Sequence, residues 1–410
     1  MEHKTGCRLL VQISIATQVV EVLLAEDSRA FVAASSLFEN GSWQEAFTLA
    51  RAWKVTPPLA GRVQSLKLKM PPAENANLRR EFLKMHGQSA FRASQAIRAI
   101  QCLEQAGIAV VAFKGIASMA VLYGDPRHRT IHDADLLVRP SDVAGAVACL
   151  ERQGFARAGR ESLAEYVQFV GNSPGFAGNK AVTLYGAGGG EIDLHWELRG
   201  SGLTTVEILQ RAVTARLMGA EIPVVDCADG FLLTIHHTIR ENLAVESVLR
   251  DLLDIRLWCQ RLQDNGQLES AMRRAVHAGG HVSALAVTSL LNSYDATPGI
   301  RDAVAWLQDV ANPGERLSAS RLMELFQYQL AHGRMEKDVL YLVHSHPWSQ
   351  ILRGLGADWS GYRRSMHTIE KQLGEERPWL QRVSLLAKSI PGLRGLKLAR
   401  ELARVKYGAN

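Results

Sequence analysis

Two aspartates separated by a single residue, Asp133 and Asp135, lie near the end of the stretch FKGIASMAVLYGDPRHRTIHDADLLV, which spans residues 113–138. The apolar residues around them predict a strand over residues 130–138. Successive side chains of a strand point to opposite faces, so both carboxylates are expected on one face. Hard divalent cations are usually held by one or two carboxylates together with substrate phosphates. The pair therefore predicts phosphoryl or nucleotidyl transfer at a metal site.

The length and composition of the chain predict a soluble globular protein. Its 410 residues are 47% hydrophobic, enough to bury one large core or two to three smaller ones. The formal net charge of +6 suits a surface that attracts phosphates. Spread over this length, however, the charge is too dilute to establish nucleic-acid binding, and we do not expect nucleic acid as a partner.

The cysteines and the apolar N-terminal segment indicate in which cellular compartment the protein is expected. The five cysteines are odd in number, lie far apart and form no CxxC motif, so neither a disulfide framework nor a zinc site is expected. A cytoplasmic location follows. Residues 9–24 are apolar but contain Gln12, Gln18 and Glu21, which makes them an amphipathic helix and too short for a membrane span. A signal peptide stays open as an alternative reading of this segment.

The pattern along the chain predicts an α+β fold, in which a small mixed β-sheet core is flanked by N-terminal and C-terminal helical segments. We divide it into an N-terminal helical segment (1–105), an α/β core (106–200) that carries the acidic pair, and a C-terminal helical domain (201–410). The elements that we expect are helices over 42–53, 82–103, 115–123 and 140–153, strands over 108–113 and 130–138, a glycine-linked hairpin over 181–198 and helices from 229 onward. For the basic segment 377–406 we favour a solvated helix that closes the domain, with a basic amphipathic helix as the alternative.

A two-metal site usually needs a third carboxylate, because two side chains cannot fill both coordination spheres. The predicted strand GEIDLHWEL offers candidates, since alternation puts Glu191, Asp193, His195 and Glu197 on one face. We choose Asp193 because it lies in the middle of the strand. The alternative is an outward, solvated face of the hairpin. His195 either orients Asp193 or its metal, or is a partly buried histidine with a satisfied hydrogen bond.

An anion site is expected beside the carboxylates. Lys114 and Gly115 lie where a strand gives way to a helix, so the first N–H groups of that helix and the lysine ammonium would face a triphosphate. Ser118 follows one turn later. Arg129, just before the acidic strand, is placed to add charge-assisted contacts to phosphate oxygens. Lys114 as an ordinary lysine at a strand end is the alternative.

With these elements in this order, the chain resembles a known family, the uncharacterised bacterial nucleotidyltransferases of the polymerase-β-like nucleotidyltransferase superfamily. The resemblance covers residues 40 to 260 or so. Several ordered elements make it more specific than an isolated Asp-x-Asp pair. The elements of the pattern in this chain are Lys114-Gly115, Tyr123-Gly124, Arg129, Asp133-Ala134-Asp135 and Asp193-Leu194-His195-Trp196.

The resemblance implies two Mg²⁺ or Mn²⁺ ions held by Asp133, Asp135 and Asp193. It also implies transfer of a nucleoside monophosphate from an NTP, with ATP expected, to a hydroxyl group of a small molecule, peptide or protein, with release of pyrophosphate. The chain departs from the superfamily in one respect. Lys114-Gly115 stands where a Gly-Ser pair is common, so a lysine point charge would take over the phosphate contact.

Two other function classes stay open. The missing Gly-Ser pair would permit a catalytically degenerate protein that binds a nucleotide and regulates or scaffolds a partner. The basic C-terminal segment would permit a helical nucleic-acid-binding protein. Among the remaining polar residues, we interpret His236 and His237 as packing residues and assign Asp251 and Asp254 to helix-surface ion pairs, with a reach back to Arg129 as the alternative.

Overall fold

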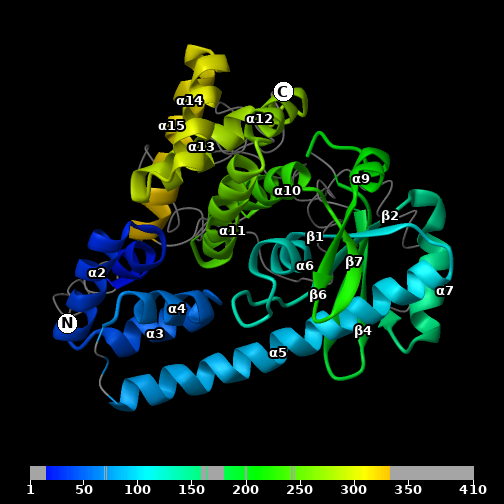
Figure 1. The fold of residues 1–410 in the computed structure, drawn as a ribbon, viewed down its shortest axis with the longest axis horizontal. Helices are drawn as coiled ribbons and strands as arrows, with labels where there is room; N and C mark the ends of the chain where they lie inside the picture. The colour runs from blue at the N-terminus through cyan, green and yellow to red at the C-terminus, as the bar shows by residue number, and fades with distance from the viewer. Residues whose placement is uncertain are drawn as a thin grey trace, which may run out of the picture.

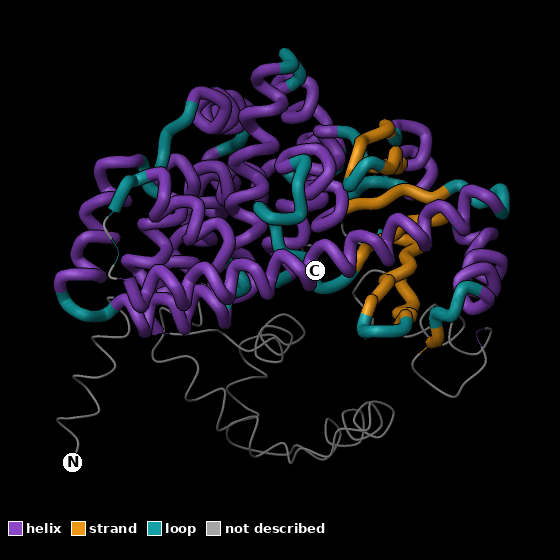
Figure 2. The backbone as a smooth tube through the Cα atoms, turned by 60° about the horizontal axis from the view of Figure 1, so that its bottom comes forward, coloured by secondary structure: helices purple, strands orange, loops and turns teal. Residues whose placement is uncertain are grey.

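The computed structural model describes residues 15–332, except 69, 71, 158–162, 164–179, 199–200, 242 and 244. It confirms an α+β fold, with a mixed seven-stranded sheet and helices on either side of it in the chain. In Figure 2 the strands gather at one end of the molecule and helices occupy the other. The basic segment 377–406, for which we expect a helix, lies outside the described residues.

The N-terminal region is helical, as predicted. Residues 15–24 form a helix whose apolar side chains are buried, and four further helices follow, α2 (Asp27–Glu39), α3 (Trp43–Ala52), α4 (Thr56–Ser65) and α5 (Pro72–Gln105). Helix α5 has 34 residues, so it is about 50 Å long. It runs from the N-terminal helices to the sheet (Figure 1), and its contacts include strands β1, β2, β5 and β7.

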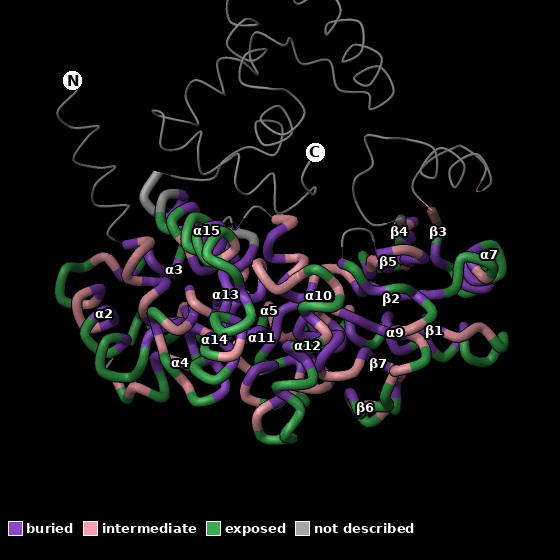
Figure 3. Tube along the Cα trace, turned by 90° about the horizontal axis from the view of Figure 1, so that it is seen from above, coloured by how far each residue is buried: buried purple, intermediate pink, exposed green. Residues whose placement is uncertain are grey.

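The sheet has the strand order β3-β4-β5-β2-β1-β7-β6. Its strands are β1 (Val110–Phe113), β2 (Ala134–Val138), β3 (Ala156–Arg157), β4 (Lys180–Gly186), β5 (Gly190–Glu197), β6 (Val213–Leu217) and β7 (Ala220–Val224). Strand β2 is central and all five of its residues are buried, like the four of β1. Figure 3 shows these two strands as buried stretches of the chain. Because β2 begins at Ala134, our expected strand start at residue 130 was wrong, and Asp133 precedes the strand.

The strands that pair with β2 determine which side chains lie side by side on the sheet. Strand β2 is antiparallel to β1 and parallel to β5, and β5 is antiparallel to β4 in the glycine-linked hairpin that we predicted. The burial of β5 alternates from residue 190 to 194, with Ile192 and Leu194 buried and Glu191 and Asp193 half-buried. This alternation confirms a polar and an apolar face for the strand.

A second hairpin, β6–β7, extends the sheet beyond residue 200 and was not anticipated. Its two-residue turn is Met218-Gly219, both with positive φ, which is the geometry that matches the twist of paired strands. Methionine gives no turn signal, and alternating polar residues on β6 gave no apolar run. Strand β7 pairs with β1 through Ala112 and Val224. The three-part domain division itself stays a prediction.

The remaining helices pack on the sheet and on one another. They are α6 (Lys114–Ser118), the π-helical η1 (Met119–Tyr123), the 3-10 helix η2 (Pro140–Asp142), α7 (Val143–Arg152), α9 (Thr205–Arg211), α10 (Cys227–Arg240), α11 (Val245–Asp264), α12 (Leu268–His277), α13 (His281–Tyr294), α14 (Pro298–Val310) and α15 (Pro313–His332). Helices α10 and α11 pack together over their length, with Trp258 fully buried. Helix α11 also contacts η1, which connects the C-terminal helices to the sheet.

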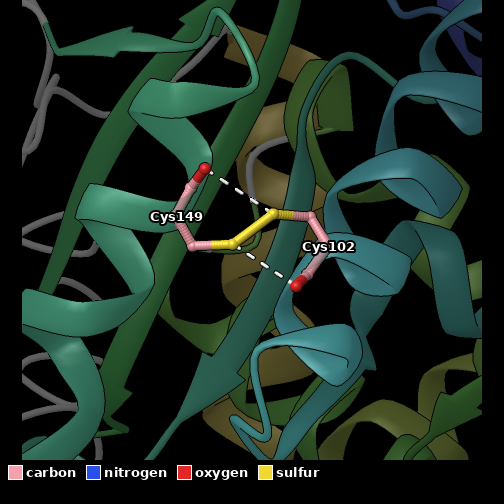
Figure 4. The surroundings of a disulfide bond; sticks show 2 residues. All are labelled: Cys102 and Cys149. Carbon is pink, nitrogen blue, oxygen red and sulfur yellow. Dashed lines mark hydrogen bonds between the residues drawn. A yellow bond between two sulfur atoms is a disulfide. The ribbon is translucent and has the colours of Figure 1, made fainter.

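A disulfide joins α5 to α7, and our expectation of no disulfide was wrong on this point. Cys102 in α5 and Cys149 in α7 are bonded although 47 residues separate them (Figure 4). The two helices pack against each other beside the sheet, and that packing brings the cysteines together. No local cysteine motif could reveal the pairing, because only tertiary structure creates it. Cys227 and Cys259 are free.

Within the described residues, every helix is too short or too polar to cross a bilayer.

Candidate functional site

A row of four side chains crosses the sheet from β1 to β4. Strand pairing places Phe113 opposite Asp135, Asp135 beside Asp193, and Asp193 opposite Thr183. Residues paired in register share a face, so both aspartates project from the same side. The hydroxyl of Thr183 donates a hydrogen bond of 2.6 Å to Oδ1 of Asp193. The structure therefore brings together carboxylates that are 58 positions apart in the sequence.

Asp135, Asp193 and His195 form a group suited to a divalent cation. Each offers one ligand atom, and these atoms all lie within 4.8 Å of one another. Asp135 and His195 are buried, whereas Asp193 is half-buried. Nε2 of His195 lies 2.9 Å from Oδ1 of Asp135, and its ring packs edge-on against Phe113. Within the described residues, the hydrogen bonds to both carboxylates go to their Oδ1 atoms, which leaves the Oδ2 atoms for other ligands.

Lys114 is held against this group. Its backbone is left-handed, with φ of 50°, which is uncommon for a residue with a side chain and typical of functional sites. Its Nζ lies 2.6 Å from Oδ1 of Asp135. Burial alone would lower the pKa of Lys114, but the Asp135 charge outweighs it and raises that pKa. Conversely, burial would raise the pKa of Asp135, and Lys114 with His195 holds it well below its usual range. Both groups are therefore charged at neutral pH.

Asp133 lies at the entrance of the same site. It is half-buried, one residue before β2, and it is outside the close group formed by Asp135, Asp193 and His195. Its pKa is raised, first by burial and then by the negative charge of Asp135, with Asp193 adding to the effect. Glu191 shows the same pattern, because burial and then Asp193 raise its pKa. The site thus carries an excess of negative charge that a cation would relieve.

The predicted glycine and serine positions surround the start of α6. A Cβ at Gly115 would lie 3.0 Å from Cγ2 of Ile131, so glycine allows the helix to approach the loop before β2. Ser118 is fully buried, and its Oγ has no hydrogen-bond partner among the described residues. Their roles as phosphate contacts, like that of Lys114, stay predictions.

Arg129 is engaged elsewhere in the structure. Its guanidinium donates hydrogen bonds to both carboxylate oxygens of Asp254, at 3.0 Å each, and lies 3.7 Å from Asp251. The phenol of Tyr123 donates to Asp254 at 2.9 Å. All three charged groups are buried. Our assignment of Asp251 and Asp254 to helix-surface ion pairs was therefore wrong, and the reach back to Arg129 is what the structure shows.

His237 joins this second group. Its Nδ1 lies 2.6 Å from Oδ2 of Asp251, so our interpretation of His237 as a packing residue was incomplete. We call the set formed by Tyr123, Arg129, His237, Asp251 and Asp254 the α11 network. It connects η1 and the loop before β2 to helices α10 and α11. Its function in the fold is to fix these helices against the loop that carries Asp133.

Sequence reasoning missed Thr183 and gave no weight to three cationic residues that border the site, Lys54, Arg92 and Arg250. Thr183 becomes visible only through the β4–β5 register. The three cations come from the turn between α3 and α4, from α5 and from α11, and no motif connects them. Electrostatic interaction with Asp133 or Glu191 places all three near the acidic residues.

Comparison with known proteins gives a family match for this chain. A family profile described as uncharacterised nucleotidyltransferase matches residues 39–294, more than half of the chain. Among solved structures, the chain is similar to an antigenic nucleotidyltransferase-like protein from Paracoccidioides brasiliensis, at 16% identity and a TM-score of 0.28, over 45% of this chain and 87% of that one. No curated protein matches. The profile match shows that the chain belongs to this family of uncharacterised nucleotidyltransferases.

Proposed function

We propose that the protein is a metal-dependent nucleotidyltransferase of the polymerase-β-like superfamily. It moves a nucleoside monophosphate from an NTP to a hydroxyl-bearing acceptor. The observation that carries this proposal is the in-register pair Asp135 and Asp193, which with His195 places one ligand atom each within 4.8 Å of one another, at a site where Asp135 and His195 are buried and Asp193 is half-buried. Family membership supports the same class of reaction.

The donor set fits a divalent cation. Two carboxylates and an imidazole, each with a ligand atom aimed at a shared space, match the ligand preferences of Mg²⁺ or Mn²⁺, and Asp133 would complete the set from the loop before β2. A bound ion supplies a Lewis acid that polarises the phosphate and lowers the pKa of an acceptor hydroxyl. The excess negative charge among Asp133, Asp135 and Asp193 agrees with this role, since it raises the pKa of Asp133.

Residues of the chain position the reacting groups and accept the proton of the acceptor. The acceptor oxygen forms a bond to the α-phosphorus, the bond from that phosphorus to the bridging oxygen breaks, and pyrophosphate leaves. The proton of the acceptor hydroxyl passes to the carboxylate of Asp193, which is half-buried and retains a free Oδ2. Thr183 orients that carboxylate, and His195 with Lys114 orients Asp135. The sequence predicts Lys114, Gly115, Ser118 and Arg129 as phosphate-binding residues, and in the structure Lys114 is ion-paired with Asp135 and Arg129 with Asp254.

ATP is the donor that we expect, and the acceptor is a small molecule, a peptide or a protein hydroxyl. The test is incubation with each α-labelled NTP, Mg²⁺ or Mn²⁺ and a cell extract, followed by measurement of label transfer and pyrophosphate release. Asp193→Asn should abolish both. Asp309→Asn is a matched control, because Asp309 is exposed on α14 and loses the same charge. Equal transfer by the wild type and by Asp193→Asn would overturn the proposal.

A catalytically degenerate nucleotide-binding protein is the second candidate. The observation in its favour is the contact of Lys114 with Asp135, which already satisfies one oxygen of a proposed ligand. This candidate predicts that the protein binds NTP but releases no pyrophosphate with any acceptor. Pyrophosphate release that depends on Asp193 excludes it.

A further inference from the structure

The side chains of Arg92 and Arg250 and the backbone of Lys54 contact the loop that leads into β2. Nη1 of Arg92, from α5, donates to the carbonyl of Ile131 at 2.8 Å, and Nη1 of Arg250, from α11, donates to the carbonyl of Thr130 at 3.2 Å. The hydroxyl of Thr130 donates to the backbone carbonyl of Lys54, between α3 and α4, at 2.8 Å. We call Lys54, Arg92 and Arg250 the basic cluster. It joins three regions of the chain at one loop.

The cluster has no counter-ion of its own. Within the described residues, no carboxylate lies within ion-pair distance of any of its three members, although all are half-buried. By contrast, Lys114 is paired with Asp135, and Arg129 with Asp254. The two cations that the sequence proposes for phosphate are therefore already matched. The basic cluster is the unmatched positive charge beside the site.

Electrostatics point to the same imbalance. Burial lowers the pKa of Lys54, and the charge of Arg250 lowers it further, against a smaller opposing effect of Asp133. Burial and then the charge of Arg129 lower the pKa of Arg250 to about 10. A lowered pKa of a basic group means that its charged form is destabilised where it stands. An anion bound between these side chains would remove that cost.

The cluster borders the acidic residues rather than standing apart from them. Arg92 contacts the carbonyl of Ile131, two residues before Asp133, and its charge acts on Glu191. Asp133 in turn acts on both Lys54 and Arg250. Negative and positive side chains thus adjoin across one short loop. A ligand that spans both would need a metal-binding part and a separate, strongly anionic part.

We propose that the basic cluster binds the β- and γ-phosphates of the donor NTP, while the α-phosphate lies at Asp135 and Asp193. This inference rests on the proposed function. Two guanidinium forks and an ammonium suit a polyphosphate, because arginine binds phosphate oxygens through two parallel hydrogen bonds and lysine adds a point charge. The same side chains would hold pyrophosphate as it leaves. Lys54 belongs to the N-terminal helices, so these helices become part of the substrate site.

Lys54 gives the cleanest test, because no hydrogen bond or ion pair of its ammonium within the described residues would be lost with it. Binding of ATP, AMP and inorganic tripolyphosphate is measured by titration calorimetry on the full chain in Mg²⁺. We expect Lys54→Gln to weaken the binding of ATP and of tripolyphosphate about tenfold or more, because a charge-assisted contact to phosphate is lost, and to leave the binding of AMP unchanged. Lys54→Arg should retain ATP binding.

Arg79→Gln is the matched control, because Arg79 is exposed on the same helix as Arg92 and about 20 Å away along its axis. Far-ultraviolet circular dichroism of each variant establishes that it is folded. Arg92→Lys and Arg250→Lys keep the positive charge but lose the planar guanidinium group. Each should weaken ATP binding by a smaller factor than the double variant that combines it with Lys54→Gln.

The outcomes separate this inference from the proposed function. If Lys54→Gln leaves ATP affinity unchanged, or weakens the binding of AMP as much as that of ATP, the cluster does not bind the polyphosphate and the inference is overturned. Asp193-dependent label transfer would then still support the nucleotidyltransferase. A cluster that instead binds a phosphate of the acceptor would leave both ATP and tripolyphosphate affinity intact, which also overturns it.

Discussion

Two buried polar groups in this protein are built from the same residue types but differ in charge balance. In the sheet site, Asp135 is ion-paired with Lys114, and the Oδ2 atoms of Asp135 and Asp193 lack a hydrogen-bond partner in the described structure. In the α11 network, Asp254 receives three hydrogen bonds, two from Arg129 and one from Tyr123. The first group therefore retains carboxylate oxygens that could bind a ligand. In the second group, the oxygens of Asp254 are already hydrogen-bonded within the fold.

The difference separates a binding site from a structural network. A buried carboxylate without enough partners is costly, so an arrangement that retains several of them needs a ligand to compensate. A matched buried network instead fixes the elements that it joins, here η1, α10 and α11. Mutations should therefore affect activity in the sheet site and folding stability in the α11 network.

Replacing Asp193 should have the largest effect on activity. We expect Asp193→Asn to reduce nucleotidyl transfer at least about 10³-fold, because loss of a metal ligand removes several kcal/mol of transition-state stabilisation. Its melting temperature should change little, since Asp193 is half-buried and hydrogen-bonds only to Thr183. Steady-state pyrophosphate release and thermal unfolding measure the two effects. Unfolding of the variant at ordinary temperature would place Asp193 with the structural residues.

Replacing Asp254 should show the opposite pattern. Asp254→Asn leaves the guanidinium of Arg129 buried without its main counter-charge, and breaking a buried ion pair costs about 3–5 kcal/mol. The free energy of unfolding, measured in urea, should fall by that amount. The folded fraction should retain nucleotide affinity. A stable variant with lost activity would instead show that the α11 network belongs to the active site.

The Cys102–Cys149 bond offers a comparison with both networks, because it links α5 and α7 covalently. Cys102→Ser should lower the free energy of unfolding by about 2–4 kcal/mol, given a loop closed over 47 residues, with little change in activity. Thiol titration and peptide mass mapping of protein isolated without reductant show whether the bond forms. Free thiols at both positions would favour the cytoplasmic location predicted from the sequence.

The smallest expected effect is the dependence of stability on pH through Asp251. Burial would raise the pKa of Asp251, but His237 and then Arg129 outweigh it, so the folded pKa lies below the unfolded value of about 3.9. This stabilisation is present above that value and is lost as the pH falls through the folded pKa. Urea unfolding at pH 3 and pH 6 should show a larger decrease for the wild type than for Asp251→Asn. Equal decreases would contradict it.

Much of the fold follows from local pattern. The apolar run that contains β1, the helix that begins at Lys114 and the glycine-linked hairpin of β4 and β5 were predictable, because periodicity and turn residues are encoded locally. The start of β2 was misplaced by four residues, since apolar residues of the preceding loop, such as Ile131, resemble a strand. The β6–β7 hairpin was missed, because its turn contains Met218 rather than asparagine or aspartate.

The sequence by itself determined that Asp193 and His195 share one face of their strand, because alternation along a strand depends only on the chain. Its placement of Asp133 on the strand face of Asp135 was wrong, because β2 begins at Ala134. Tertiary structure decided which partner each charge acquires. Strand register placed Asp193 beside Asp135, and helix packing placed Arg129 against Asp254. The same packing left the basic cluster without a counter-ion among the described residues. Pairing between residues more than a hundred positions apart depends on how elements pack, and no local pattern carries that information.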